Sequence, residues 1–179
     1  YSGLDKDYKY EDSNTHSPYV INEKNIKNRW KQNIEINPVF LNGKLVFVSA
    51  DWKIICIDIE NKKILWELDS VFPPSRRGII AYTKNGSDFL ILPLGAKTYK
   101  LDLNTGKRVK TFGNDGSVNL TTITSPIVDI EKNILIITQH TNKAVYKVNL
   151  DNGKIIKSIA LFEAKDRNFV GGTQWAGTA

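Results

Sequence analysis

Apolar residues along most of this chain occur in short runs that are rich in Val, Ile, Phe and Tyr and are separated by turn residues. This pattern begins at Pro38 and is typical of β-strands, because β-branched and aromatic side chains favour an extended backbone. Helical spacing is confined to a short segment near the N-terminus, where Asn22 is placed to cap a helix that ends at Trp30. We therefore expect an all-β chain, preceded by an irregular segment with a short helix over residues 1–33.

The clearest predicted hairpin has its turn at Asn42-Gly43, since this dipeptide tolerates the positive φ angles of a type I′ turn. Strands are expected on both sides of this turn, over 39–41 and 44–48. Two more are expected beyond it, over 54–59 and 64–68. Four short antiparallel strands within about thirty residues form one blade of a β-propeller.

The same order of strands and turns returns twice more along the chain, over 79–112 and 126–159. An eleven-residue unit that contains Asp58, Asp102 and Asn149 aligns at offsets of 44 residues (58 to 102) and 47 residues (102 to 149). Such offsets match the roughly 40 to 50 residues of a four-stranded blade. In each copy the Asx side chain is placed to accept backbone N–H groups of the turn that follows.

The repeat predicts three consecutive blades over residues 38–159, within a partial propeller that spans 34–179. The aligned unit resembles the tryptophan-docking motif of quinoprotein propellers, Ala-x-Asp-x-x-Thr-Gly-x-x-x-Trp. The copies keep different members of it: Asp58 and Trp66 in the first, Asp102, Thr105 and Gly106 in the second, and Gly153 in the third. In that family the closing Trp stacks on the turn of the next blade, so we expect Trp66 to pack against the neighbouring blade.

Further segments are similar to those of the pyrroloquinoline quinone (PQQ)-dependent dehydrogenases, in the same order along nearly the whole chain. They are Tyr1-Ser-Gly3, His16-Ser17-Pro18, the strand pair from Pro38 to Val48, Arg77-Gly78, Thr111 to Leu120, and Gly171-Gly172-Thr173-Gln174-Trp175. The resemblance implies that the chain is the N-terminal portion of an eight-bladed ring in a periplasmic protein. It also implies PQQ and calcium as cofactors, with the catalytic Asp and later calcium ligands beyond Ala179.

By this resemblance four residues are candidates for binding the quinone: Glu35, Arg77, Thr173 and Trp175. The resemblance gives Trp175 the stacking role and Thr173 a hydrogen-bonding position, while Arg77 faces the quinone carbonyls and stabilises the reduced, anionic form. Glu35 matches a quinone-contacting Glu. The alternatives remain open: an inter-blade loop for Trp175, and exposed surface positions for Arg77 and Glu35.

The chain departs from the family in two places. Ser75-Arg76 stands where many members carry adjacent cysteines, and the stretch from Gln139 to Lys143 offers no carboxylate where alcohol-oxidising members have a calcium-binding Glu. His140 is interpreted as a turn residue and not a metal ligand, because His16 is the only other histidine.

The net charge of +6 is interpreted as a solvated surface that protects strand edges, and not as a nucleic-acid site, because no basic stripe with interleaved aromatics occurs. The lysines assigned to that surface are Lys44, Lys53, Lys62, Lys84, Lys107, Lys132 and Lys154. Cys56 lies in an apolar run and is expected to be a buried, inert thiol. No stretch approaches the roughly twenty apolar residues of a membrane-spanning helix.

Two functions follow as hypotheses. The first is a quinoprotein dehydrogenase that oxidises an alcohol or sugar, a small hydroxylated substrate, with transfer to the quinone. The second is a non-catalytic PQQ-repeat propeller that acts as a protein-binding scaffold. In either case three blades leave open sheet edges, so we expect the rest of the ring or a second copy of the chain to cover them.

Overall fold

The fold was obtained as a computed structural model of the whole chain. It describes residues 37–49, 52–70, 78–120, 122, 124–139 and 144–160. Within these ranges the backbone forms short β-strands joined by tight turns, and no helix occurs. The prediction of an all-β chain is confirmed there, whereas the helix expected before Trp30 lies outside the described residues.

The strands follow the apolar runs of the sequence and fall into three sets of four. The first set is β1 (Val39–Leu41), β2 (Lys44–Val48), β3 (Ile54–Asp58) and β4 (Lys63–Leu68). The second is β5 (Ile80–Lys84), β6 (Ser87–Leu94), β7 (Lys97–Asp102) and β8 (Ser117–Val118). The third is β9 (Ile127–Asp129), β10 (Ile134–Gln139), β11 (Ala144–Asn149) and β12 (Ile155–Ala160). Each set forms one antiparallel sheet in chain order, and we call these sheets blade 1, blade 2 and blade 3.

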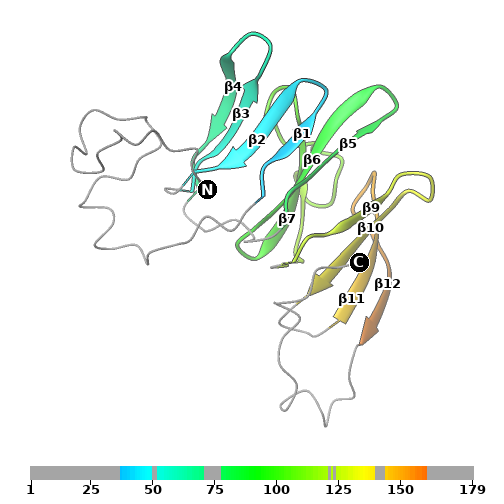
Figure 1. Cartoon of the computed structure of the whole chain (residues 1–179). Coiled ribbons are helices and arrows are strands. Elements are labelled where there is room, and N and C mark those ends of the chain that lie inside the picture. The colour runs from blue at the N-terminus through cyan, green and yellow to red at the C-terminus, as the bar shows by residue number, and fades with distance from the viewer. Residues whose placement is uncertain are drawn as a thin grey trace, which may run out of the picture.

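The three sheets lie side by side as consecutive blades (Figure 1). Their first strands are neighbours, because β1 contacts β5 and β5 contacts β9. In a propeller the first strand of every blade lines the central axis, so these contacts identify the axial side of the assembly. The predicted architecture, three blades of a partial β-propeller, is confirmed.

The hairpin between β1 and β2 has the predicted turn. Asn42 and Gly43 both adopt positive φ angles, 47° and 75°, as a type I′ turn requires. The register Leu41↔Lys44 leaves two residues in the loop and lets the strands twist together without a bulge. Local turn chemistry therefore fixes the pairing of the two innermost strands of blade 1.

Each blade repeats one turn at the end of its third strand, where an Asx side chain accepts a backbone N–H three residues later. The three hydrogen bonds are Asn61 N to Asp58 Oδ1 at 3.0 Å, Thr105 N to Asp102 Oδ1 at 2.8 Å, and Asn152 N to Asn149 Oδ1 at 3.0 Å. The predicted equivalence of Asp58, Asp102 and Asn149 is confirmed. Lys62 takes the place of the turn glycine in blade 1 and still adopts a left-handed φ of 51°.

The outgoing strand of blade 2 differs from the prediction. Pairing starts as expected, since Val109 N donates to the carbonyl of Lys100 at 2.9 Å, but the chain then leaves the sheet and β8 begins only at Ser117. The excursion is held by the next blade: Gly113 N donates to the carbonyl of Asn152 at 2.9 Å. A local turn, in which Phe112 N donates to the carbonyl of Val109 at 2.9 Å, and this contact with blade 3 together take the chain out of the sheet.

Two apolar cores hold the blades together, one at each junction. The core between blades 1 and 2 includes Val46, Ile54, Cys56 and Trp66 on one side and Leu90, Leu92, Leu101 and Leu103 on the other. The core between blades 2 and 3 includes Tyr82, Ile91 and Phe112 facing Leu135, Ile137, Val148 and Leu150. Burial of these side chains between sheets is the main stabilising contribution, because each sheet alone would leave both faces in water.

Candidate functional site

The four quinone-binding candidates, Glu35, Arg77, Thr173 and Trp175, lie outside the described residues, and so does His140. What the described residues show is how the blades dock on one another and where cavities lie between them. Buried polar groups lie at these junctions, which form the candidate site among the described residues.

The junction of blades 1 and 2 is closed by a tryptophan. Trp66 is 8% exposed, and its indole Nε1 donates to the carbonyl oxygen of Leu103 at 2.8 Å. A Cβ added to Gly106 would lie 2.7 Å from the Trp66 ring, so the turn peptide of blade 2 is stacked directly on the indole. The prediction that Trp66 packs against the neighbouring blade is confirmed, and the absence of a side chain at Gly106 is what permits it.

Cys56 lies opposite Trp66 in the sheet and points at the same carbonyl, with its Sγ 3.8 Å from the oxygen of Leu103. Its side chain is fully buried. Burial raises the pKa of the thiol to about 11, so the reactive thiolate is scarce at neutral pH. Cys56 is buried, as predicted, and its inertness stays a prediction.

A lysine performs the equivalent contact between blades 2 and 3. Lys100 occupies the place of Cys56 in the repeat, and its Nζ donates to the carbonyl oxygen of Leu150 at 3.0 Å, the counterpart of Leu103. The residue is only 3% exposed, and the ammonium lies 4.3 Å from the centre of the Phe89 ring. Burial lowers the pKa of Lys100, while the field of Asp151 opposes that effect. Lys100 is therefore an interior docking residue that the sequence analysis missed.

Ion pairs link the blades near the hairpin turns. Lys44 Nζ of blade 1 lies 3.1 Å from Asp88 Oδ2 of blade 2, and Lys84 Nζ lies 2.6 Å from Asp151 Oδ1 of blade 3. The lysine side chains are only 17% and 14% exposed. The prediction that Lys44 and Lys84 are solvated surface residues is wrong, because each joins one blade to the next.

Hydrogen bonding keeps Asp88 ionised. Burial by itself would raise the pKa of this carboxyl. Hydrogen bonds donated by Thr83, Lys44 and Asn42 outweigh that effect and hold the pKa below its ordinary value. Asp88 is thus a charged acceptor shared by two blades.

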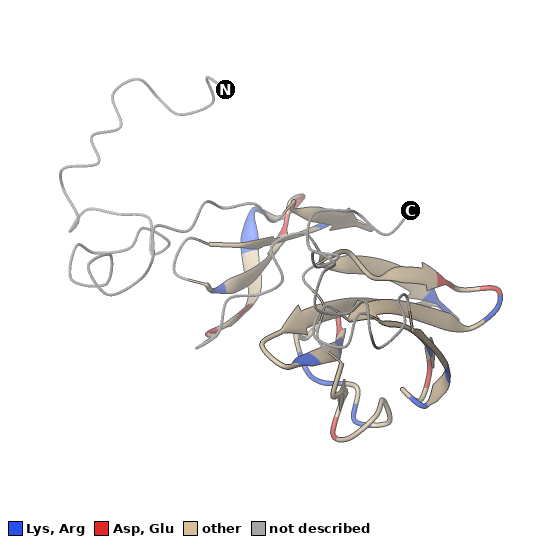
Figure 2. Ribbon diagram, turned by 90° about the horizontal axis from the view of Figure 1, so that it is seen from below, with Lys and Arg blue, Asp and Glu red and all other residues tan. Residues whose placement is uncertain are grey.

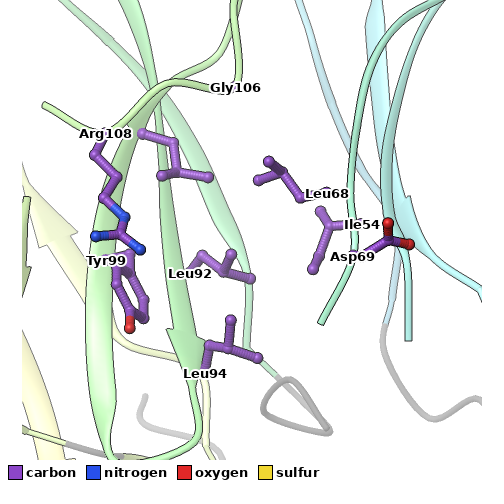
Figure 3. A pocket seen from close by; sticks show the side chains of 9 residues that line it. Ile54, Leu68, Asp69, Leu92, Leu94, Tyr99, Gly106 and Arg108 are labelled. Carbon is purple, nitrogen blue, oxygen red and sulfur yellow. The ribbon is translucent and has the colours of Figure 1, made fainter. Parts of the chain in front are cut away.

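A groove of about 150 Å³ opens between blades 1 and 2 (Figure 3). Ile54 and Leu68 form one wall, and Leu92, Leu94 and Tyr99 form the other. Arg108 lies over the Tyr99 ring with a distance of 5.1 Å to its centre, and its guanidinium donates to Asp115 Oδ2 at 3.2 Å. The groove can hold a small apolar group.

The groove does not fit the quinone. A planar tricarboxylate needs a stacking surface and several paired donors, whereas this groove offers one guanidinium that already binds a carboxylate. Among the described residues no group of three or more His, Cys, Asp or Glu side chains comes together as a metal site. The described residues therefore supply no chemical step through PQQ or calcium.

Charged residues are dispersed over the three sheets, with basic and acidic positions close to one another (Figure 2). Lys132 and Asp129 form such a pair within one turn, at 3.0 Å. In the part of the chain that the structure describes, no helix is long and apolar enough to cross a membrane.

The fold and the docking contacts define a β-propeller of the tryptophan-docked class. Residues 13–158 match the family described as "Glucose/ethanol/alcohol dehydrogenase, beta-propeller domain". The chain belongs to this family of PQQ-type propellers.

Solved structures share the fold at low sequence identity. BamB from Moraxella catarrhalis is 11% identical with a TM-score of 0.54, and the match covers 74% of this chain and 37% of BamB. The quinohemoprotein alcohol dehydrogenase from Comamonas testosteroni is 15% identical with a TM-score of 0.51, and the match covers 72% of this chain and 21% of the enzyme. This chain therefore spans only a minor part of either protein. No curated protein sequence matches it.

Proposed function

We propose that this chain forms the first blades of a PQQ-dependent alcohol or sugar dehydrogenase, acting in the periplasm on a small hydroxylated substrate. The observation that carries the proposal is family membership over residues 13–158, together with the axial placement of β1, β5 and β9. In the sequence Glu35 stands four residues before β1 and Arg77 three residues before β5. Both candidates therefore precede neighbouring axial strands in the sequence.

In this proposal the blades described above serve as a rigid support for the quinone contacts. The supporting chemistry is the set of docking contacts at Leu103 and Leu150, which fix the angle between successive blades. Bound PQQ would supply the two-electron acceptor for oxidation of the substrate's alcohol carbon. Arg77 would supply positive charge to the reduced quinone, and Trp175 a flat apolar surface.

Equilibrium dialysis of the chain against PQQ in the presence of calcium tests the proposal. We expect weak retention of the quinone that is lost in Arg77→Ala and in Trp175→Ala. Arg108→Ala is the matched control, because Arg108 belongs to the groove between blades 1 and 2 and not to the axial strands. Retention that survives the first two substitutions, or no retention at any quinone concentration, contradicts the proposal for this chain.

The second candidate is a non-catalytic propeller that binds other proteins. The observation in its favour is β12, an edge strand whose side chains are all exposed, among them Ile155, Ile156 and Ile159. Apolar residues on an open edge strand favour pairing with another polypeptide. A chain that retains no PQQ but forms a stable complex through β12 would favour this function over the first.

A further inference from the structure

Three turns of this chain contain the dipeptide Asn-Gly, at Asn42-Gly43, Asn85-Gly86 and Asn152-Gly153. This dipeptide is chemically reactive as well as a good turn former, because glycine has no Cβ to keep its backbone nitrogen away from the asparagine side chain. The nitrogen can attack the carbonyl carbon of that side chain when the turn peptide rotates and both groups are free. The three dipeptides differ in this freedom, since their hydrogen bonds and packing are different.

The Asn42 side chain is held by blade 2. Its Nδ2 donates to Asp88 Oδ1 at 2.9 Å and to Thr83 Oγ1 at 3.2 Å. The first bond is charge-assisted, because Asp88 is ionised. Rotation of the side chain toward the nitrogen of Gly43 breaks both bonds. The turn of blade 1 is therefore protected by its contact with the next blade, although Asn42 is exposed.

The turn at Asn152-Gly153 is restrained through its backbone. Gly153 N donates to the carbonyl oxygen of Asn149 at 2.9 Å, so the attacking atom is already engaged. Asn152 Oδ1 accepts a hydrogen bond from Lys154 N at 3.0 Å, which fixes the side chain as well. A Cβ added to Gly153 would lie 2.6 Å from Gly113 N of blade 2. The turn peptide therefore has no room to rotate.

The turn at Asn85-Gly86 has none of these restraints. Both residues are exposed at the tip of the hairpin between β5 and β6, and nothing lies within 4 Å of a Cβ built on Gly86. Among the described residues, neither the Asn85 side chain nor the Gly86 N–H has a hydrogen-bond partner. The hairpin belongs to blade 2, whose two faces are covered by blades 1 and 3. The exposure of this tip is therefore not that of an open blade face.

We propose that Asn85 is a site of spontaneous deamidation, a covalent modification from which the fold protects Asn42 and Asn152. A base from the solvent removes the amide proton of Gly86, and the nitrogen forms a bond to Asn85 Cγ. The Cγ–Nδ2 bond breaks, Nδ2 takes up a proton and leaves as ammonia, and a cyclic succinimide remains. Water then opens the ring at either carbonyl and gives aspartate or isoaspartate. The net reaction consumes water, releases ammonia and needs no oxidant.

The products disturb the junction of blades 2 and 3. Asn85 follows Lys84, whose Nζ lies 2.6 Å from Asp151 Oδ1 and 2.6 Å from Asn133 Oδ1. A carboxylate at position 85 competes with Asp151 for this ammonium. Isoaspartate also lengthens the backbone of the turn by a methylene group, which disturbs the pairing of Lys84 with Ser87. Deamidation therefore weakens the link between the two blades.

Peptide mapping by mass spectrometry of the intact chain, aged under mildly alkaline conditions, tests the proposal. In the native chain, conversion at Asn85 should be about tenfold or more faster than at Asn42 or Asn152, because breaking their hydrogen bonds adds to the barrier. In urea the three rates should become similar, since only the fold distinguishes the three dipeptides. Conversion at Asn42 or Asn152 that is as fast as at Asn85 in the native chain overturns the proposal. So does an Asn85 that reacts in urea but not in the native chain.

A variant tests the cause of the protection. Asp88→Ala removes the charged acceptor of Asn42, so conversion at Asn42 should rise about tenfold while that at Asn152 is unchanged. An unchanged rate at Asn42 in a variant that keeps its circular dichroism spectrum overturns this part of the proposal. If the variant does not fold, the comparison of native and urea-unfolded wild-type chain still decides, because it needs no substitution.

The effect on the blade junction has its own control. The aged wild-type chain should unfold at a lower urea concentration than the fresh chain, because the link through Lys84 is weakened. Asn85→Gln is the matched control, since attack on the longer side chain has to close a larger ring and is slow. Ageing should leave the unfolding midpoint of this variant unchanged. A wild-type chain that is converted at Asn85 and keeps its midpoint overturns the inferred effect on the junction.

Discussion

Removing the Trp66 side chain, which docks blade 1 on blade 2, should lower the free energy of unfolding by a large amount. This loss can be divided into a packing contribution and a hydrogen-bond contribution. Trp66→Ala removes a side chain that is more than nine-tenths buried, and it leaves a cavity between two sheets that cannot close without moving a blade. Aromatic-to-alanine changes at such sites cost about 3–5 kcal/mol. The indole N–H is a separate contribution, since its 2.8 Å hydrogen bond to Leu103 is worth about 1 kcal/mol.

Two substitutions separate these contributions. Trp66→Phe keeps a ring against Gly106 but loses the indole N–H, so its loss in free energy of unfolding should include the hydrogen bond and part of the packing. Trp66→Ala should lose the hydrogen bond and the whole packing contribution. Urea unfolding followed by far-ultraviolet circular dichroism gives each free energy of unfolding, compared at equal m-value. Ile64→Ala on the same strand is the control, because Ile64 is exposed. A loss below about 0.5 kcal/mol for Trp66→Ala, the range of surface substitutions, would refute the docking role.

The remaining predictions concern single buried groups. Gly106→Ala should destabilise the chain well beyond Gly86→Ala, because both glycines have positive φ but only the first meets the Trp66 ring; equal losses would contradict this. Since burial lowers the pKa of Lys100, the unfolded chain binds the proton more tightly, and the free energy of unfolding should rise with pH between the lowered and the ordinary lysine pKa. This slope should vanish in Lys100→Met. Cys56 should react with iodoacetamide at neutral pH only in urea, and rapid labelling of the native chain would contradict its burial. Tyr82→Phe should raise the free energy of unfolding by up to about 1 kcal/mol, because the buried hydroxyl has no partner among the described residues. A large decrease of this free energy in urea unfolding would show instead that the hydroxyl forms a hydrogen bond.

The strand repeat was predictable because it depends on local chemistry. Asn42-Gly43 specifies its turn without help from the rest of the chain, and the Asx side chains at 58, 102 and 149 close their turns within three residues. Such signals are present in a short window of sequence. They are sufficient to place three blades, and they fail only where a neighbouring blade intervenes.

The break in the outgoing strand of blade 2 is such a place. The outgoing strand was predicted to continue to Phe112, but the chain turns at Val109, where Phe112 N donates to the carbonyl of Val109, and Gly113 N then donates to the carbonyl of Asn152 in blade 3. The ion pairs of Lys44 and Lys84 were missed for the same reason, because their partners are 44 and 67 residues away. Lys100 could have been found, since the repeat aligns it with the predicted buried residue Cys56.

The candidate quinone site rests only on resemblance and stays a prediction. Glu35, Arg77, Thr173 and Trp175 show no common spacing, and they lie in segments whose chemistry is not repeated from blade to blade. A repeat defines positions that recur, and a cofactor site on the axis is made from residues that do not. The structural framework is thus encoded three times in this chain, whereas each candidate quinone contact occurs once in the sequence.

The two junctions show why the docking motif can be lost while the propeller remains. The acceptor is a backbone carbonyl in both cases, at Leu103 and at Leu150, and a backbone group is present whatever the side chain. Only the donor has to be supplied, by an indole N–H at the first junction and by an ammonium at the second. The ammonium has the higher desolvation cost, which the Phe89 ring 4.3 Å away offsets in part. Because donors as different as these meet the same requirement, the junction depends on the turn that presents the carbonyl and not on one kind of docking side chain.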